Sequence, residues 1–84
     1  MNPREPVRWF AACMEERLRI HDDERGTDGW RAESTDWLMG RLVEEGRELE
    51  RVMADEKADY RDVIAECADV ANFAMMVADK MKGR

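Results

Sequence analysis

The chain has 84 residues, of which 20 are acidic and 14 are basic, giving a net charge of −6. This charge argues against a nucleic-acid polymer as partner, because a phosphate backbone is bound by a basic surface. A chain this short forms one domain, residues 1–84, and buries only about 60% of its unfolded surface, so we expect further subunits to complete its core.

The first predicted helix runs from Val7 to about His21, with Pro6 at its start. Its apolar residues are spaced three and four apart, as on one face of an α-helix. They are Val7, Phe10, Met14 and Leu18. The segment from Asp22 to Glu33 is rich in glycine and acidic residues and predicts a loop.

A second helix is predicted from a cap at Ser34 or Thr35 to about Met53. A break follows at 54–59, and a last helix runs from about Tyr60 to Lys82, stopped by Gly83. No stretch alternates as a strand does. The sequence therefore predicts an all-α fold, a helical bundle of about three helices per chain that oligomerisation completes.

No stretch approaches the ~20 apolar residues of a membrane span. The first residues, Met-Asn-Pro-Arg-Glu-Pro, lack the apolar core of a secretory signal. We therefore expect a cytoplasmic protein without a membrane partner. Cys13 and Cys67 fall among apolar neighbours in predicted helices, which favours two reduced, packed thiols over a disulfide.

Two pairs of acidic residues interrupt the apolar faces of the second and third predicted helices. Glu45 lies three positions after one leucine of its apolar stripe and four before the next, so it sits within that stripe. Glu66 is placed in the same way between two valines. In each pair the second acid, Glu48 or Asp69, follows three positions later on the same side. Two such helices side by side would bring four carboxylates together.

A carboxylate buried without compensation is costly and normally binds a proton, a counter-ion or a metal. Oxygen ligands suit a hard divalent ion, Mg²⁺ or Mn²⁺, which shares its remaining positions with phosphate oxygens. The pattern therefore favours a metal site and a phosphate compound as substrate. A di-iron bundle site is excluded because neither motif carries Glu-x-x-His, and the single histidine, His21, is more typical of a cap or surface residue than of a ligand. The other interpretation is that the acids lie on helix surfaces and pair with arginines, namely Arg41, Arg47, Arg51 or Arg61.

The two acidic segments resemble a known family pattern. Leu-Val-Glu-Glu-Gly-Arg-Glu-Leu at 42–49 and Ala-Glu-Cys-Ala-Asp-Val-Ala-Asn-Phe at 65–73 are similar to the Glu-Glu-x-x-Glu … Glu-x-x-Asp signature of the MazG-like all-α nucleoside triphosphate pyrophosphohydrolases. That superfamily also includes dimeric dUTPases. The resemblance covers about half of the chain, and the early helix followed by Gly29 and Trp30 is similar to short, phage-type members. Either half of the signature alone is weak, whereas the doublet with its spacing is more specific.

The resemblance implies that Glu45, Glu48, Glu66 and Asp69 bind Mg²⁺, with Mn²⁺ as a substitute, and that Glu44 helps from an outer shell or positions water. The implied reaction is hydrolysis of a (deoxy)nucleoside triphosphate to the monophosphate and pyrophosphate by a homodimer or homotetramer, which cleans or biases the nucleotide pool. A bound metal ion neutralises phosphate oxygens and lowers the pKa of water. A carboxylate not fully used in coordination can accept the water proton, and we assign that role to Glu48.

Five further residues are candidates for substrate binding. Trp37, on the acid-bearing side of its helix, and Trp30, in the glycine-flanked loop, could each stack on a base, although packing is the commoner use of tryptophan. Asn72 could read a base or sugar edge through its amide, with surface hydrogen bonding as the other explanation. Arg41 and Lys80 could supply positive charge for phosphates, with complementation of the helix dipole as the other explanation for Lys80.

Two alternatives stay open from the sequence. The acids could belong to a non-catalytic helical oligomer that binds a structural cation or a basic partner protein, and such a surface should tolerate Asp69→Asn. The chain could also be a family member that binds nucleotides without hydrolysing them, because longer relatives bring extra helices that shape the base pocket.

Overall fold

The computed structural model describes residues 2–83, without the side chains of Glu24 and Arg25. The elements, in chain order, are helix α1 (Glu5–Ile20), a short helix α2 (Asp22–Arg25), a 3₁₀ turn η1 (Gly29–Ala32) and the helices α3 (Thr35–Ala54) and α4 (Tyr60–Lys82). No strand occurs between residues 2 and 83. The prediction of an all-α bundle of about three long helices per chain is confirmed.

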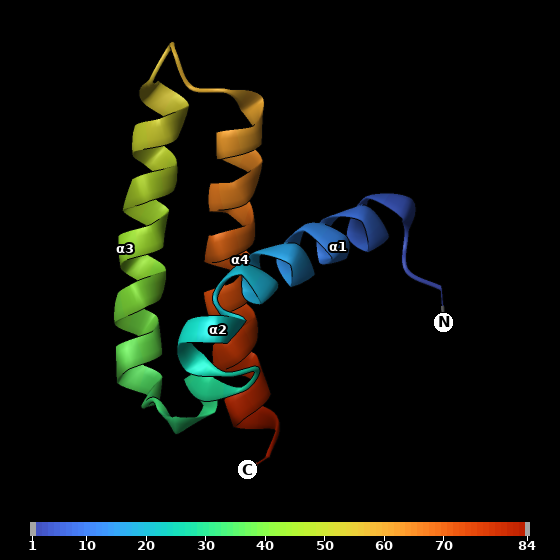
Figure 1. Cartoon of the computed structure of the whole chain (residues 1–84), viewed down its shortest axis with the longest axis vertical. Helices are drawn as coiled ribbons and strands as arrows, with labels where there is room; N and C mark the ends of the chain where they lie inside the picture. The colour runs from blue at the N-terminus through green and yellow to red at the C-terminus, as the bar shows by residue number, and fades with distance from the viewer. Residues whose placement is uncertain (1, 84) are drawn as a thin grey trace.

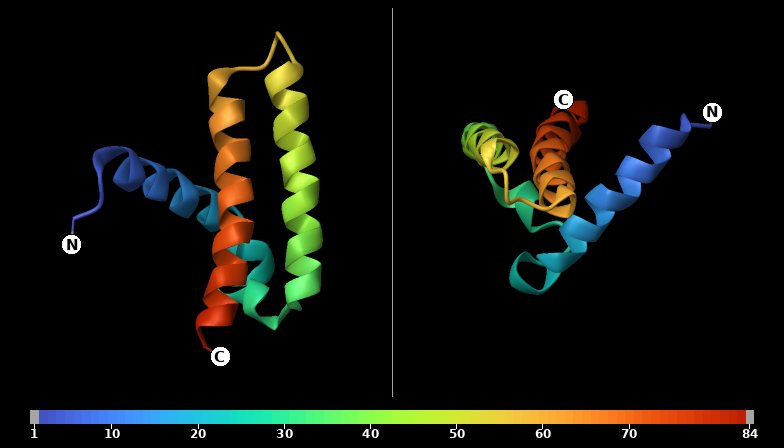
Figure 2. Two further views of the ribbon diagram at one scale, coloured as in Figure 1. Left: turned by 180° about the vertical axis from the view of Figure 1, so that it is seen from behind. Right: turned by 90° about the horizontal axis from the view of Figure 1, so that it is seen from above.

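Helices α3 and α4 form an antiparallel hairpin, and α1 crosses α4 at a steep angle (Figure 1). Figure 2 shows that only the C-terminal part of α1 lies against the hairpin, whereas its N-terminal half extends away from it. The short elements α2 and η1 fill the space between the end of α1 and the start of α3. The molecule is therefore an open helical bundle, in which the N-terminal half of α1 extends from the α3–α4 hairpin as an arm.

Both long helices of the hairpin begin at capping side chains. Oγ of Ser34 accepts a hydrogen bond from the backbone N–H of Trp37 over 3.0 Å, and Oδ1 of Asp59 accepts one from the backbone N–H of Arg61 over 2.9 Å. Each cap satisfies a donor that the first helical turn leaves without a partner. Gly83 ends α4 with a φ of −83°, so the helix stops there without a left-handed glycine.

The segment from Asp22 to Glu33, predicted to be a loop, contains α2 and η1 instead. The physical reason is Trp30, whose side chain is only 9% exposed and packs into the core with residues of α3 and α4. Gly26, at a φ of +76°, ends α2 and turns the chain toward that contact. The loop prediction was therefore wrong for these two short elements.

The core is small. Among the described residues, four buried apolar side chains pack together as its centre, namely Trp30, Leu38, Phe73 and Met76, and Ala68 is buried as well. Leu18, Leu42, Met75 and Val77 pack around them and stay partly exposed. Cys13 and Cys67 are both free and half-buried, as predicted. None of the described helices is long and apolar enough to cross a lipid bilayer.

The chain exposes more surface than a compact monomer of its size. Its accessible area is 6426 Å², whereas a 9.8 kDa monomer exposes about 5,200 Å² by the usual scaling of area with mass. Its radius of gyration is 13.6 Å, against about 12 Å for a compact domain of this length. The N-terminal half of α1 contributes to the excess, because Val7 and Trp9 are at least half exposed.

Candidate metal centre

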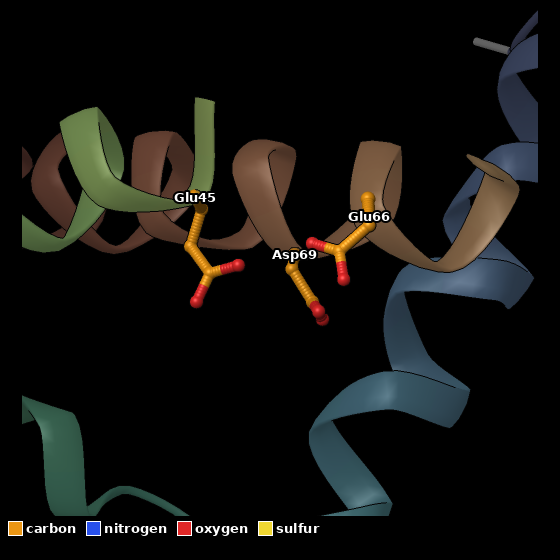
Figure 3. Close-up of side chains that lie close together, drawn as sticks. All are labelled: Glu45, Glu66 and Asp69. Carbon is orange, nitrogen blue, oxygen red and sulfur yellow. The ribbon is translucent and has the colours of Figure 1, made fainter. Parts of the chain in front are cut away.

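Three carboxylates converge where α3 and α4 lie side by side. Glu45 comes from α3, and Glu66 and Asp69 come from α4; one carboxylate oxygen of each lies within 4.8 Å of the other two. Figure 3 shows the three side chains next to one another, directed to the same side of the hairpin. The structure thus brings together three of the four acids that the sequence predicted as a cluster.

Glu48 lies outside this group of three. Its carboxylate pairs with Arg51 over 2.8 Å, and its side chain is 41% exposed. It is still close enough for its charge to contribute to the raised pKa of Glu66. One turn of α3 separates Glu45 from Glu48, and the hairpin packing directs only the former between the two helices. Glu44 is more exposed still and pairs with Arg41.

Glu66 is the least compensated of the three acids. Its Oε2 atom is buried and has no hydrogen-bond partner among the described residues. Burial, followed by the negative charges of Asp69 and Glu45, raises the pKa of Glu66 to about 6. The side chain therefore holds a proton more firmly than an exposed glutamate does, and a cation at the cluster would release that proton.

Two arginines neutralise the other two acids. Arg17, on α1, donates from Nε and Nη2 to the two carboxylate oxygens of Asp69 over 2.9 and 3.0 Å. Arg41, on α3, donates from Nη2 to Glu45 over 2.8 Å, and its guanidinium lies 5.2 Å from the centre of the Phe73 ring. Glu45 and Glu48 thus pair with arginines that the sequence suggested, Arg41 and Arg51. Asp69 pairs instead with Arg17, which the sequence did not suggest.

Arg17 is the site residue that sequence reasoning missed, although a signal was available. It lies three positions after Met14 and next to Leu18, on the edge of the apolar stripe of the first helix. Unlike Glu45 and Glu66, it has no apolar residue four positions later, where His21 stands, so the signal is weaker. A partly buried guanidinium is usually paired with an acid.

A pocket of about 100 Å³ opens beside the acids. Its apolar wall includes Trp30, Phe73 and Met76, and its polar wall includes Arg17 and Arg41 next to Glu45 and Asp69. Complete small-molecule sites usually measure roughly 300–1,000 Å³. The pocket of one chain is therefore smaller than such sites.

The predicted substrate-binding residues divide between this pocket and other places. Trp30, Arg41 and Asn72 line the pocket; Trp30 does so as a core residue with Arg31 over its ring at 5.1 Å, rather than as part of an open loop. Asn72 is 3% exposed and donates from Nδ2 to the main-chain oxygen of Met14.

Trp37 and Lys80 do not line it. Trp37 is more than a third exposed on the first turn of α3. Nζ of Lys80 donates to the main-chain oxygens of Arg31, over 3.1 Å, and of Glu33. These hydrogen bonds hold η1 against α4. His21, in contrast, lines the pocket through its place at the end of α1.

The donor set suits a hard divalent cation. Three carboxylates, one of them with a buried and unpaired oxygen, offer oxygen ligands only. Oxygens bound to one Mg²⁺ at 2.0–2.1 Å are at most about 4.2 Å apart, which is close to the 4.8 Å within which the three carboxylate oxygens lie. The residues present therefore fit the ion that the resemblance implies.

Comparison with protein-family models, with curated protein sequences and with solved structures finds no match for this chain.

Proposed function

We propose that this chain is a Mg²⁺-dependent nucleoside triphosphate pyrophosphohydrolase that converts a (deoxy)nucleoside triphosphate to the monophosphate and pyrophosphate. One observation carries the proposal. Glu45, Glu66 and Asp69 converge from two helices, and Glu66 presents a buried oxygen that no described residue satisfies. A buried acceptor of this kind is costly unless a proton or a cation compensates it.

In this proposal the three clustered acids hold the cation, for which Mn²⁺ could substitute. The bound ion would neutralise phosphate oxygens and lower the pKa of a water molecule. Glu48 stands one turn from Glu45 and outside the cluster, so it remains able to accept a proton as general base. Glu44, paired with Arg41, would fix the position of that arginine at the pocket.

The pocket beside the acids would receive the rest of the substrate. Trp30 and Phe73 offer apolar ring surface for a base, and Asn72 offers an amide. Arg17 and Arg41 offer guanidinium groups, which suit phosphate oxygens. The phosphate chain would then lie in the pocket next to the arginines and the acids.

We further propose that the active form is a homodimer or homotetramer. The excess of about 1,200 Å² over a compact monomer compares with roughly 1,000–2,500 Å² that each subunit of an obligate dimer buries. The exposed apolar residues Val7 and Trp9 on the arm of α1 suit such an interface. A second subunit would also enlarge a pocket that is too small in one chain.

A second candidate function is favoured by the arginine pairs. Arg17 and Arg41 already neutralise Asp69 and Glu45, as they would in a non-catalytic helical oligomer whose acids serve only to hold its helices or a structural cation. In that case nucleotide hydrolysis is absent and Asp69→Asn changes stability alone.

The experiment that tests the proposal is pyrophosphate release from the eight standard ribo- and deoxyribonucleoside triphosphates and dUTP, with and without Mg²⁺. Wild type is compared with Glu66→Gln and with Glu50→Gln, an exposed acid on α3 outside the cluster. Release that depends on Mg²⁺, is lost in Glu66→Gln and persists in Glu50→Gln supports the enzyme. A folded wild type that releases no pyrophosphate from any nucleotide supports the second candidate.

A further inference from the structure

Two nitrogens of the Arg17 guanidinium, Nε and Nη2, donate to a single acid of the cluster. Nε and Nη2 contact Oδ1 and Oδ2 of Asp69 at 2.9 and 3.0 Å, the two-pronged geometry in which a guanidinium matches a carboxylate. Both oxygens of Asp69 therefore carry a positively charged donor. A divalent cation that binds Asp69 meets this guanidinium as a competitor of the same sign.

The positive charge of Arg17 also acts on the other two acids. Its hydrogen bond to Asp69 is the main cause of the raised pKa of Arg17, and the negative charges of Asp69, Glu66 and Glu45 add to it. One side chain of α1 is thus coupled to all three carboxylates, which belong to α3 and α4. This is the arrangement expected of an internal counter-ion.

The surroundings of Arg17 leave room for the side chain to change partner. It is partly exposed and lies between two hollows of the surface. One is the pocket with Trp30 and Arg41; the other is an open groove of about 370 Å³ with Glu66 and Val52. Since phosphate matches the guanidinium fork as well as a carboxylate does, a phosphate chain in the first pocket offers Arg17 a second partner.

We propose that Arg17 is an exchangeable counter-ion, which holds Asp69 when the cluster has no cation and moves to the phosphate groups of the nucleotide when a cation takes its place. This inference rests on the proposed function and adds a residue of α1 to it. Its consequence is a positive coupling between cation and nucleotide. The cation releases Arg17 for the phosphates, and the phosphates remove Arg17 from competition with the cation.

The test measures Mn²⁺ binding by calorimetry, in the absence and presence of an α,β-methylene nucleoside triphosphate that cannot be hydrolysed at that bond. Wild type is compared with Arg17→Gln, Arg17→Lys and the control Arg19→Gln. Arg19 lies on the same helix, in an exposed ion pair with Glu15. Circular dichroism confirms folding, and Arg17→Lys keeps the test open if Arg17→Gln does not fold.

Without nucleotide, we expect Arg17→Gln to bind Mn²⁺ about 3- to 10-fold more tightly than wild type, because one ion pair no longer competes. Arg17→Lys should fall between them, since lysine keeps the charge but cannot form the fork. With the analogue, the gain in Mn²⁺ affinity should be at least about 5-fold smaller in Arg17→Gln than in wild type. Arg19→Gln should behave as wild type.

The outcomes separate the two proposals. Equal Mn²⁺ affinity and equal coupling in wild type and Arg17→Gln overturn the role of Arg17 and leave the proposed function standing. An Arg17→Lys variant identical to wild type, with only Arg17→Gln altered, also overturns the exchange, because charge alone then explains the effect. If no variant binds Mn²⁺, the proposed function fails and the role of Arg17 fails with it.

Discussion

Asn72 of α4 donates a hydrogen bond from Nδ2 to the main-chain oxygen of Met14 on α1, over 3.0 Å. The amide orientation follows from this contact, since a carbonyl oxygen needs a donor. It leaves Oδ1 of Asn72 buried and without a partner among the described residues. The bond is one of few polar links between α1 and the hairpin, and it lies at the wall of the pocket.

We expect Asn72→Ala to lower the free energy of unfolding by about 1–3 kcal/mol, because the oxygen of Met14 loses its donor and a gap opens at a buried position. For a domain of this size that corresponds to a fall in Tm of roughly 4–8 °C per kcal/mol. Urea and thermal unfolding measure it. Asn2→Ala, at an exposed position before α1, serves as control and should change little. A Tm for Asn72→Ala equal to that of wild type would show that the bond adds nothing to stability.

The raised pKa of Glu66 predicts a particular dependence of stability on pH. The pKa of Glu66 is about 6 in the folded chain and about 4.3 in the unfolded chain. Between about pH 4.3 and pH 6, therefore, Glu66 is mostly protonated in the folded chain and mostly ionised in the unfolded chain. The free energy of unfolding should therefore fall as the pH rises from about 4.3 to above 6, by about 2 kcal/mol at most, because solvent screens a side chain that is only partly buried. Asp79, whose pKa is lowered mainly by Lys82, acts below pH 3.8 and in the opposite sense.

Urea unfolding at several pH values, in the presence of a chelator, measures this effect. Glu66→Gln should remove the fall and should be at least as stable as wild type above pH 6.5, because the neutral amide has no charge to desolvate. Glu56→Gln, in the connection between α3 and α4, should keep the wild-type profile. Parallel pH profiles for wild type and Glu66→Gln would contradict the assignment of the raised pKa.

The position of Glu48 outside the cluster predicts unequal effects of the acids on hydrolysis. Replacing a clustered acid, as in Glu66→Gln, should lower kcat by more than about 100-fold and weaken Mn²⁺ binding as well. Glu48→Gln should lower kcat by a similar factor if it is the general base, but should leave the Kd for Mn²⁺ within about threefold of wild type. Steady-state kinetics and Mn²⁺ titration, compared side by side, make the distinction. A large loss of Mn²⁺ affinity in Glu48→Gln would instead make Glu48 a ligand.

The exposed arm of α1 predicts where subunits meet. We expect wild type to have a molar mass of two or four times 9.8 kDa in light scattering coupled to size exclusion, and Trp9→Asp to shift it toward the monomer, because a charge would be buried at the interface. Met53→Asp also replaces an exposed apolar side chain with a carboxylate, but on α3 and away from the arm. It should keep the wild-type mass. A wild type that elutes as a monomer at high concentration contradicts the proposal.

Much of the fold could be predicted from the sequence because its signals are local. The side chains of Ser34 and Asp59 cap helices by accepting from backbone N–H groups three and two residues later. The helix from Tyr60 to Lys82 follows a regular apolar spacing and begins and ends as predicted. The segment around Trp30 was mispredicted because its turns form only through burial of that ring against α3 and α4. Such a contact leaves no periodic trace in a segment of twelve residues.

The candidate site could be predicted in part for a related reason. Helical spacing places Glu45, Glu66 and Asp69 on facing stripes, and the structure brings them together. The same spacing does not fix how far the stripe of α3 is rotated toward α4, and that rotation leaves Glu48 beside Arg51. The pairing of Arg17 with Asp69 depends on how α1 crosses the hairpin, and no local pattern determines that crossing.

A single unbroken helix carries both the exposed arm and Arg17. From Val7 to Arg17 is ten residues of α1, about 15 Å along a helix that has no internal hinge. A tilt of α1 by about 10° at its contact with α4 would therefore carry the Val7 end sideways by between 2 and 3 Å, roughly half the pitch of one turn. A partner bound to the N-terminal half of α1 would therefore also restrict the movement of Arg17. Conversely, the fluorescence of Trp9 should change when a cation binds at the acidic cluster.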